Sequence, residues 1–169
     1  MLMRVVLDTN CFIYAFNPSA PMYGSMQSIL QAAHSGKIIL MVSLHTLSEL
    51  EKKPDAAYKL AKTAEKIPYW TIGSIGELVG TIAELAGTIQ DMSRNEEIQE
   101  ELEKLAKSGN DIRDRGAYID ALKANADAFV TSDKHLVGSG QAQRIREKFG
   151  LRVLTPLDLV SEMTKSQSF

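Results

Sequence analysis

The sequence predicts an α/β fold in three layers, with a central parallel sheet between two layers of helices. Short apolar runs rich in β-branched residues alternate with longer stretches of helical spacing, which is typical of strand–helix–strand crossover units. The apolar runs are nearly continuous, as expected for parallel strands that are buried on both faces. Breaks between the runs are indicated by Pro54, Pro68, the Ser-Gly-Asn turn at 108–110 and the glycine-containing loop at 138–140.

Each expected element corresponds to one of these runs. The strands are expected at residues 4–7, 38–42, 128–131 and 151–154. The helices are expected at residues 22–33, 44–66, 75–90 and 96–107. Residues 73–109 have a helical pattern with no apolar strand run among them, so we expect a helical insertion there. Its second half is strongly charged and spaces Glu100 from Lys104 as on one helix face; it is either a solvated surface or a partner-binding helix.

Composition and length favour one soluble domain. The chain of 169 residues is expected to form a single domain over residues 1–160, with a C-terminal tail at 161–169. The single cysteine, Cys11, excludes an internal disulfide framework, and no apolar run approaches the ~20 residues of a membrane span. We therefore expect a cytoplasmic protein with no membrane partner. The net charge of −2 argues against a dedicated nucleic-acid binder, but not against an enzyme that contacts a polyanion through metal ions and a few local cations.

Two aspartates follow predicted strands. Asp8 ends the apolar run at residues 4–7, and Asp133 lies two residues beyond the run at 128–131. Ligands of open parallel sheets bind at the carboxyl ends of the strands, so both side chains are expected at the same edge. A helix N-cap is the alternative for Asp8, because aspartate often caps the helix that follows it.

Further acids are expected at this edge of the sheet. Asp111 and Asp114 are three residues apart in the first turn of a helix that leads into the strand before Asp133. Glu49 and Glu51 lie on the helix after the second strand. The pair Asp111 and Asp114 also matches a capping arrangement, so both interpretations stay open for it.

Helix capping can account for each acid singly, and residues 46–49, for example, match a capping box. It accounts less well for all of them together, because two like charges ~4 Å apart repel by a few kcal/mol at an effective dielectric of ~20. A fold tolerates this repulsion when a cation lies among the acids, and ligands that are oxygen only suit Mg²⁺ or Mn²⁺ rather than zinc. Such carboxylate sites commonly hydrolyse phosphodiesters, since the metal activates water and neutralises charge on the phosphate.

Three short motifs and one helix start resemble a known family. LDTN at residues 7–10, SELE at 48–51, an aspartate-led helix and VTSDKHL at 130–136 follow one another in that order. Together they resemble the PIN domain family, a metal-dependent nuclease fold that includes VapC-like toxins, and the resemblance spans residues 3–157. It implies an endoribonuclease, a hydrolase that cuts RNA with Mg²⁺ or Mn²⁺. The helical region at 73–109 is longer than a minimal member of this family needs, so the substrate side is expected to differ.

The resemblance assigns roles to individual residues. The acids implied to bind metal and to catalyse hydrolysis are Asp8, Glu49, Asp114 and Asp133. The residues implied to support them are Asn10, Thr131 and Asp111. The cations placed to contact substrate phosphate, or else ordinary surface charges, are Arg113, Arg115 and Lys134. Asp120 is left out because it lies about 120° around the helix from Asp114, and only the register of the motif favours Glu49 over Glu51.

Several functional settings stay open. The chain is expected to be either a toxin held in check by an antitoxin partner or a stand-alone processing nuclease, and homodimers are common in the family. The alternative is a non-catalytic scaffold or binding module that acts through the charged helical segment at 73–109. A haloacid-dehalogenase-like phosphatase needs a second aspartate where this chain has Asn10, which argues against that class. The histidines His34, His45 and His135 lack metal-ligand spacing and are expected at the surface or in a supporting position.

Overall fold

The computed structural model describes residues 2–67, 96–97, 100 and 116–165. The chain divides into two compact units, one formed by Met1–Ile67 with Gly116–Phe169 and the other by Pro68–Arg115. The first unit contains every strand of the sheet. The predicted insertion at 73–109 lies outside the described residues, except that positions 96, 97 and 100 are helical.

The sheet consists of five parallel strands in the order β3-β2-β1-β4-β5. The central strand β1 (Met3–Leu7) pairs with β2 (Ile38–Val42) on one side and with β4 (Ala128–Val130) on the other. β5 (Arg152–Leu154) extends the sheet beyond β4, and β3 (Glu65–Lys66) extends it beyond β2. The predicted parallel sheet is therefore confirmed, and four of its strands lie within a residue of their expected bounds.

The carboxyl ends of the central strands lie next to one another. Leu7 of β1 is in register with Val130 of β4, and Val130 is in register with Leu154 of β5. Just beyond these ends, the Asp8 N–H donates to the Val130 carbonyl at 2.9 Å, and the Thr131 N–H donates to the Leu154 carbonyl at 3.0 Å. This pairing fixes the first residues past β1 and β4 at one edge of the sheet.

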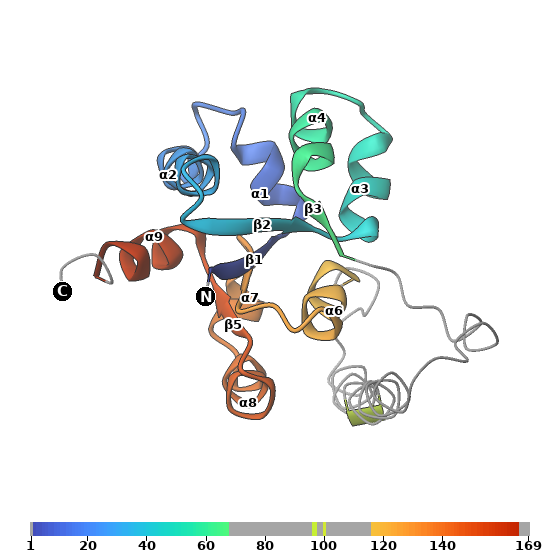
Figure 1. Ribbon diagram of the computed structural model, residues 1–169, viewed down its shortest axis with the longest axis vertical. Helices are drawn as coiled ribbons and strands as arrows, with labels where there is room; N and C mark the ends of the chain where they lie inside the picture. Colours follow the sequence, from blue (N-terminus) through green and yellow to red (C-terminus); the bar gives the residue numbers. More distant parts are fainter. Residues whose placement is uncertain (1, 68–95, 98–99, 101–115, 166–169) are drawn as a thin grey trace. The chain divides into compact units, whose positions relative to one another are not determined.

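Helices cover both faces of the sheet (Figure 1). The helices are α1 (Thr9–Tyr14), α2 (Tyr23–His34), α3 (Leu44–Glu51), α4 (Ala56–Thr63), α6 (Gly116–Lys123), α7 (Lys134–Val137), α8 (Gly140–Phe149) and α9 (Pro156–Lys165). In Figure 1, α1 to α4 lie on one side of the sheet, whereas α6 and α8 lie on the other. This is the expected three-layer α/β arrangement. No helix in the described part of the chain is long and apolar enough to cross a membrane.

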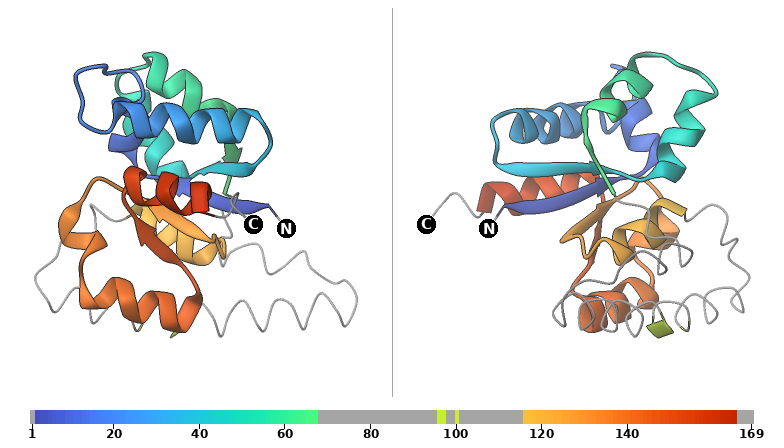
Figure 2. Two further views of the ribbon diagram at one scale, coloured as in Figure 1. Left: turned by 90° about the vertical axis from the view of Figure 1, so that its left-hand side faces the viewer. Right: turned by 45° about the vertical axis from the view of Figure 1, so that its right-hand side comes forward.

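Apolar side chains of β1 and its neighbours point to both helical layers. Val5 and Leu7 are fully buried and belong to a cluster with Phe12 of α1 and Ile29 of α2. Leu159 of α9 joins this cluster, consistent with α9 lying beside α2 (Figure 2). On the opposite face, the rings of Tyr118 and Phe129 pack with their centroids 5.4 Å apart. Burial on both faces explains why the strand sequences are nearly continuous in apolar residues.

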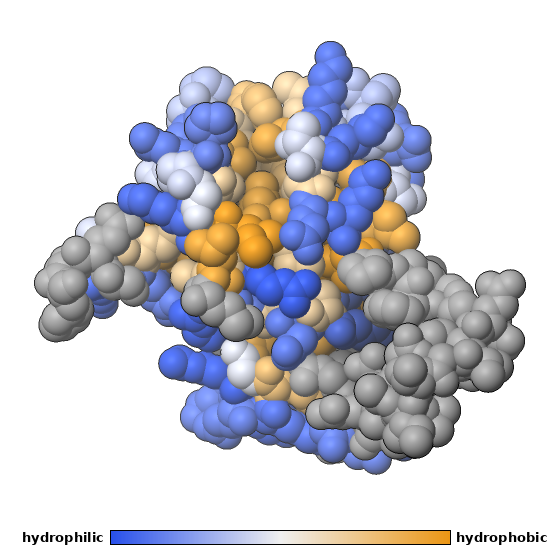
Figure 3. All heavy atoms as spheres, in the orientation of Figure 1, coloured by the Kyte–Doolittle hydropathy of each residue, from blue (hydrophilic) through white to orange (hydrophobic). Residues whose placement is uncertain are grey.

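Helix α8 shows how the outer layer meets solvent. Its buried residues Ala142, Ile145 and Phe149 recur at helical spacing, whereas its charged residues are exposed and form the hydrophilic lower rim in Figure 3. Ser139 caps its start, accepting a hydrogen bond from the Ala142 N–H at 3.1 Å. Gly150 ends it in the left-handed conformation with φ of 74°, which glycine adopts without the steric penalty of a side chain.

The predicted helix at 44–66 is wrong, because the segment forms two helices and a strand. α3 ends at Glu51, and α4 begins at Ala56 after Pro54, whose ring disfavours helical geometry in the residue before it. Asp55 then caps α4 and accepts a hydrogen bond from the Ala57 N–H at 2.9 Å. The short strand β3 follows at Glu65–Lys66 through its pairing with β2.

The predicted tail boundary is also corrected. α9 runs to Lys165, so residues 161–165 are helical rather than part of a tail. Its apolar residues explain the extension, because Leu159 is buried and Val160 and Met163 pack against the same cluster of apolar side chains.

Candidate functional site

Asp8 lies at the carboxyl edge of the sheet, directly after β1 and at the N-cap of α1. Its Oδ1 accepts a hydrogen bond from the Thr9 N–H at 2.8 Å, and its Oδ2 accepts one from the Thr131 hydroxyl at 2.9 Å. Thr131 follows β4 and is only 1% exposed. The same hydroxyl accepts a hydrogen bond from the Asp133 N–H at 3.1 Å. One buried threonine therefore links the first acid of the sequence to the backbone of the last.

The charge on Asp8 is costly in this setting. Burial raises the pKa of its carboxyl above the ordinary value of 3.8, although the hydrogen bonds from Thr131 and Thr9 lower it. The negative charges of Glu49 and Asp133 raise the pKa further. Glu49 and Asp133 therefore each lie close enough to Asp8 for their charges to act on its carboxylate. A cation placed among them would remove that repulsion.

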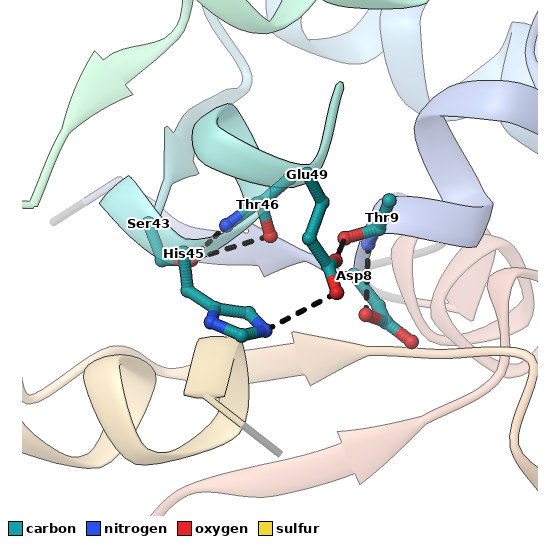
Figure 4. Close-up of polar contacts among 6 residues, drawn as sticks. All are labelled: Asp8, Thr9, Ser43, His45, Thr46 and Glu49. Carbon is teal, nitrogen blue, oxygen red and sulfur yellow. Dashed lines mark hydrogen bonds and ion pairs between the residues drawn. The ribbon is translucent and has the colours of Figure 1, made fainter. Parts of the chain in front are cut away.

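Glu49 reaches this edge from α3. One of its carboxylate oxygens, Oε2, accepts a hydrogen bond from the Thr9 hydroxyl, and the other, Oε1, lies 3.3 Å from His45 Nε2 (Figure 4). Ser43 caps α3 by accepting a hydrogen bond from the Thr46 N–H at 3.0 Å. His45 and Glu49 are four residues apart on α3, so they lie on the same face of this helix.

Asp133 lies at the N-cap of α7, where its Oδ1 accepts a hydrogen bond from the His135 N–H at 2.9 Å. Its side chain is exposed, and so are the neighbouring Lys134 and His135. An exposed lysine beside an exposed carboxylate at the strand edge is accessible to a phosphate in solvent.

The capping interpretation describes part of this arrangement. Asp8 and Asp133 do cap helices, but capping does not require the burial of Asp8 or the nearby charges of the other acids. For Glu49 the capping-box alternative is wrong, because Ser43 is the N-cap of α3 and the carboxylate of Glu49 is held by side chains. Glu51 is exposed, and its Oε1 accepts a hydrogen bond from the Tyr58 hydroxyl at 3.3 Å.

Asn10 and four residues outside the described ranges complete the predicted set. Asn10 is exposed on α1. The residues outside the described ranges are Asp111, Arg113, Asp114 and Arg115.

Sequence reasoning did not assign Thr9 or Asp120 to this edge, and it expected His45 only at the surface or in a supporting position. Thr9 lies inside the LDTN motif and holds Glu49, and His45 is four residues before Glu49, a spacing that was visible in the sequence. Asp120 lies half-buried on α6. Burial raises the pKa of the Asp120 carboxyl, whereas the positive charges of Lys123 and His45 and a hydrogen bond from the Ser43 hydroxyl lower it. Only the packing of α6 against α3 brings Asp120 to Ser43 and His45, so spacing along the chain could not reveal it.

The donor chemistry of the site fits a hard divalent cation. Each oxygen of Asp8 accepts one hydrogen bond and keeps a further acceptor position, and the neighbouring acids supply oxygen donors as well. Within the described residues, no group of three or more His, Cys, Asp or Glu side chains is close enough together to hold a metal ion. The fit therefore rests on the type of donor and on the charge around Asp8.

The chain belongs to the PIN domain family, since a family model for the PIN domain matches residues 4–135. Members of this family are generally nucleases. The fold is similar to a chain of the VapBC2 complex from Rickettsia felis, whose crystal structure contains a DNA fragment from its promoter. That likeness has 15% sequence identity and a TM-score of 0.49, and covers 90% of this chain and 98% of the other. No curated protein matches the sequence.

Proposed function

We propose that this chain is a metal-dependent endoribonuclease that hydrolyses RNA phosphodiester bonds. The observation that supports this most strongly is the half-buried carboxylate of Asp8, which is within electrostatic reach of Glu49 and Asp133 at the carboxyl edge of the sheet. Membership of a family whose members are generally nucleases supports the same chemistry. A site built only from carboxylates suits Mg²⁺ or Mn²⁺.

Four acids are proposed to hold the ion: Asp8, Glu49, Asp133 and, outside the described residues, Asp114. When bound, the ion would activate water and neutralise charge on the phosphate. The residues of the chain orient these acids. Thr131 holds Asp8 and the backbone of Asp133, and Thr9 holds Glu49 through its hydroxyl.

The substrate is proposed to be single-stranded or looped RNA. Lys134 is exposed beside Asp133 and would contact a phosphate next to the cleaved bond, as would Arg113 and Arg115 outside the described ranges. Because the chain carries a net charge of −2, only a few such contacts are available, and we expect weak binding that falls modestly with salt.

RNA cleavage by the wild type and by Asp8→Asn, in Mg²⁺, Mn²⁺ or EDTA, tests the proposal. Asparagine caps helices about as well as aspartate, so this substitution removes the charge and keeps the cap of α1. We expect metal-dependent cleavage by the wild type, none by Asp8→Asn, and wild-type activity from the matched control Glu51→Gln. A wild type that neither cleaves RNA nor changes melting temperature on addition of metal would instead favour a non-catalytic binding module.

The biological setting is a separate part of the proposal. A toxin would be purified with a bound antitoxin when the neighbouring genes are expressed together, whereas a processing nuclease would be active alone. Co-expression followed by size-exclusion chromatography distinguishes the two and also reports whether the chain forms a homodimer.

A further inference from the structure

An open groove of about 600 Å³ lies between α8 and β5, the strand at one edge of the sheet. The two elements pack against each other, and Figure 1 shows α8 next to β5. One wall of the groove carries Gln143 and Arg146 of α8, and the other consists of Arg152, Val153 and Leu154. All of these residues belong to the unit that contains the sheet.

The groove begins at the candidate site. Val137 lines its start, and the Val137 N–H donates to the Asp133 carbonyl at 3.1 Å. Leu154 lines the groove from the carboxyl end of β5, in register with Val130 of β4. The Val130 carbonyl in turn accepts a hydrogen bond from the Asp8 N–H at 2.9 Å. A nucleic-acid strand with one phosphate at these acids would therefore meet the groove as it leaves them.

The segment that forms the groove is basic, although the chain is not. Residues 134–152 contain five Lys or Arg and one acid, a net charge of +4. Because the whole chain has a net charge of −2, all its other residues together carry −6. The cations of the segment are Lys134, Arg144, Arg146, Lys148 and Arg152. A cation surplus that starts one residue after Asp133 favours contact with a polyanion at this site.

Two of these cations line the groove itself. Arg146 is exposed and forms no ion pair with the described residues. Arg152 is half-buried; its Nε donates to the Asp127 carbonyl at 3.3 Å, and its Nη1 contacts Glu162. Glu162 offsets the charge of Arg152, so Arg146 is the cation better able to bind an anion in the groove.

We propose that this groove binds the backbone of single-stranded RNA as it leaves the candidate site, and that Arg146 contacts a phosphate beyond the cleaved bond. The inference rests on the proposed function, because it takes RNA to be the substrate. The planar guanidinium of arginine suits this contact, since it can donate two parallel hydrogen bonds to phosphate. The continuity with the acids favours RNA over an acidic protein segment, because only a substrate has to pass from the acids into the groove.

Binding of fluorescent oligouridine in EDTA provides the main test. We expect Arg146→Ala to raise the Kd by about 5-fold and to reduce the slope of log Kd against log salt by ~0.7, as for one lost phosphate contact on a single strand. The matched control is Arg144→Ala, which removes the same charge from an exposed site about 200° around α8 and outside the groove. Its Kd should stay within about 1.5-fold of wild type, because salt screens charges that make no direct contact.

Two further variants separate a direct contact from general electrostatics. Arg146→Lys keeps the charge and should restore most of the salt slope, with a Kd between those of Arg146→Ala and wild type. Glu147 also lines the groove, where its Oε1 accepts a hydrogen bond from Gln143 Nε2 at 3.0 Å. Glu147→Gln should lower the Kd, because it removes a negative charge that repels the RNA backbone. An Arg146→Lys variant as weak as Arg146→Ala, or a higher Kd for Glu147→Gln, would contradict the inference.

Steady-state cleavage gives a second readout. At saturating Mn²⁺, Arg146→Ala should raise the KM for RNA by about 5-fold and leave kcat unchanged, since the contact lies away from the cleaved bond. A lower kcat with an unchanged KM would show that Arg146 acts on the reacting phosphate, and the inference would be overturned.

The binding assay in EDTA keeps the two proposals distinguishable. If the wild type cut no RNA, the proposed function would fail, and the comparison of Arg146→Ala with Arg144→Ala would still decide whether the groove binds RNA. Equal Kd values and salt slopes for these two variants would overturn the inference even if the wild type cut RNA. Tighter binding of polyglutamate than of oligouridine of equal charge, lost in Arg146→Ala, would identify an acidic protein partner and overturn it as well.

Discussion

Replacing Thr131 with valine tests whether one hydroxyl supports the central carboxylate. The change nearly keeps the shape of the side chain and removes the group that donates to Asp8 Oδ2 at 2.9 Å and accepts from the Asp133 N–H at 3.1 Å. Because Thr131 is only 1% exposed, water cannot readily take the place of the hydroxyl. A hydrogen bond to a charged acceptor contributes ~1.5–3 kcal/mol, and Asp8 is only half-buried, so we expect a loss of ~1–2 kcal/mol in the free energy of unfolding at pH 7.

The pH dependence of that loss identifies its cause. The Thr131 hydrogen bond favours the ionised form of Asp8 and lowers its pKa, so Thr131→Val should raise the pKa further. The contribution of the bond is complete while folded Asp8 is ionised, and it falls as the pH drops through the folded-state pKa, which lies above 3.8. The difference in stability between Thr131→Val and wild type should therefore be largest near neutral pH and shrink in acid.

Urea unfolding in EDTA at a series of pH values measures this difference. The control is Thr131→Ser, which keeps the hydroxyl and loses a buried methyl group, for a cost of ~1 kcal/mol that should not vary with pH. The reasoning is refuted if Thr131→Val is as stable as wild type at pH 7, or if both variants lose the same free energy at every pH.

Three further substitutions, two of them with matched controls, test other parts of the structure. In EDTA at pH 7, Asp8→Asn should have a melting temperature equal to or higher than that of the wild type, and a lower one would contradict this. Burial raises the pKa of Asp8, so the ionised carboxylate destabilises the fold as the pH rises above 3.8. Gly150→Ala should lower the free energy of unfolding, measured in urea, by ~1 kcal/mol, because the φ of 74° at this position disfavours a side chain. Its control, Gly140→Ala, should leave this free energy unchanged or raise it, since nothing lies within 4 Å of the added methyl group. Glu49→Gln should lower kcat/KM for RNA by at least ~10-fold, whereas Glu51→Gln should leave it unchanged. Equal kcat/KM values for the two variants would show that Glu49 is not part of the site.

Much of the fold could be predicted because local pattern and tertiary packing agree. The strand at Ile38–Val42 is a continuous apolar run, and the structure buries it within a parallel sheet. The strand at Glu65–Lys66 was missed because two exposed charged residues carry no strand pattern and pair only through the neighbouring strand. The break after Glu51 could have been found, since Pro54 is followed by Asp55, a common capping residue.

The candidate site was predictable where strand ends define it. Asp8 and Asp133 follow parallel strands, so topology alone brings them to one edge. The contact of Thr9 with Glu49 depends on how α1 and α3 pack, which spacing along the chain does not give. Asp120 shows this limit most clearly, because its angle on its own helix says nothing of the neighbouring helix that it meets.

A calorimetric titration of Mn²⁺ into the wild type and Asp8→Asn asks whether Asp8 holds a metal ion at the edge of the sheet. We predict that the wild type binds Mn²⁺ and that Asp8→Asn loses this binding while it stays folded, because the half-buried carboxylate lies beside Glu49 and Asp133 and keeps acceptor positions for a cation. Equal Mn²⁺ binding by the two proteins would contradict the proposed site and place any metal ion elsewhere in the chain.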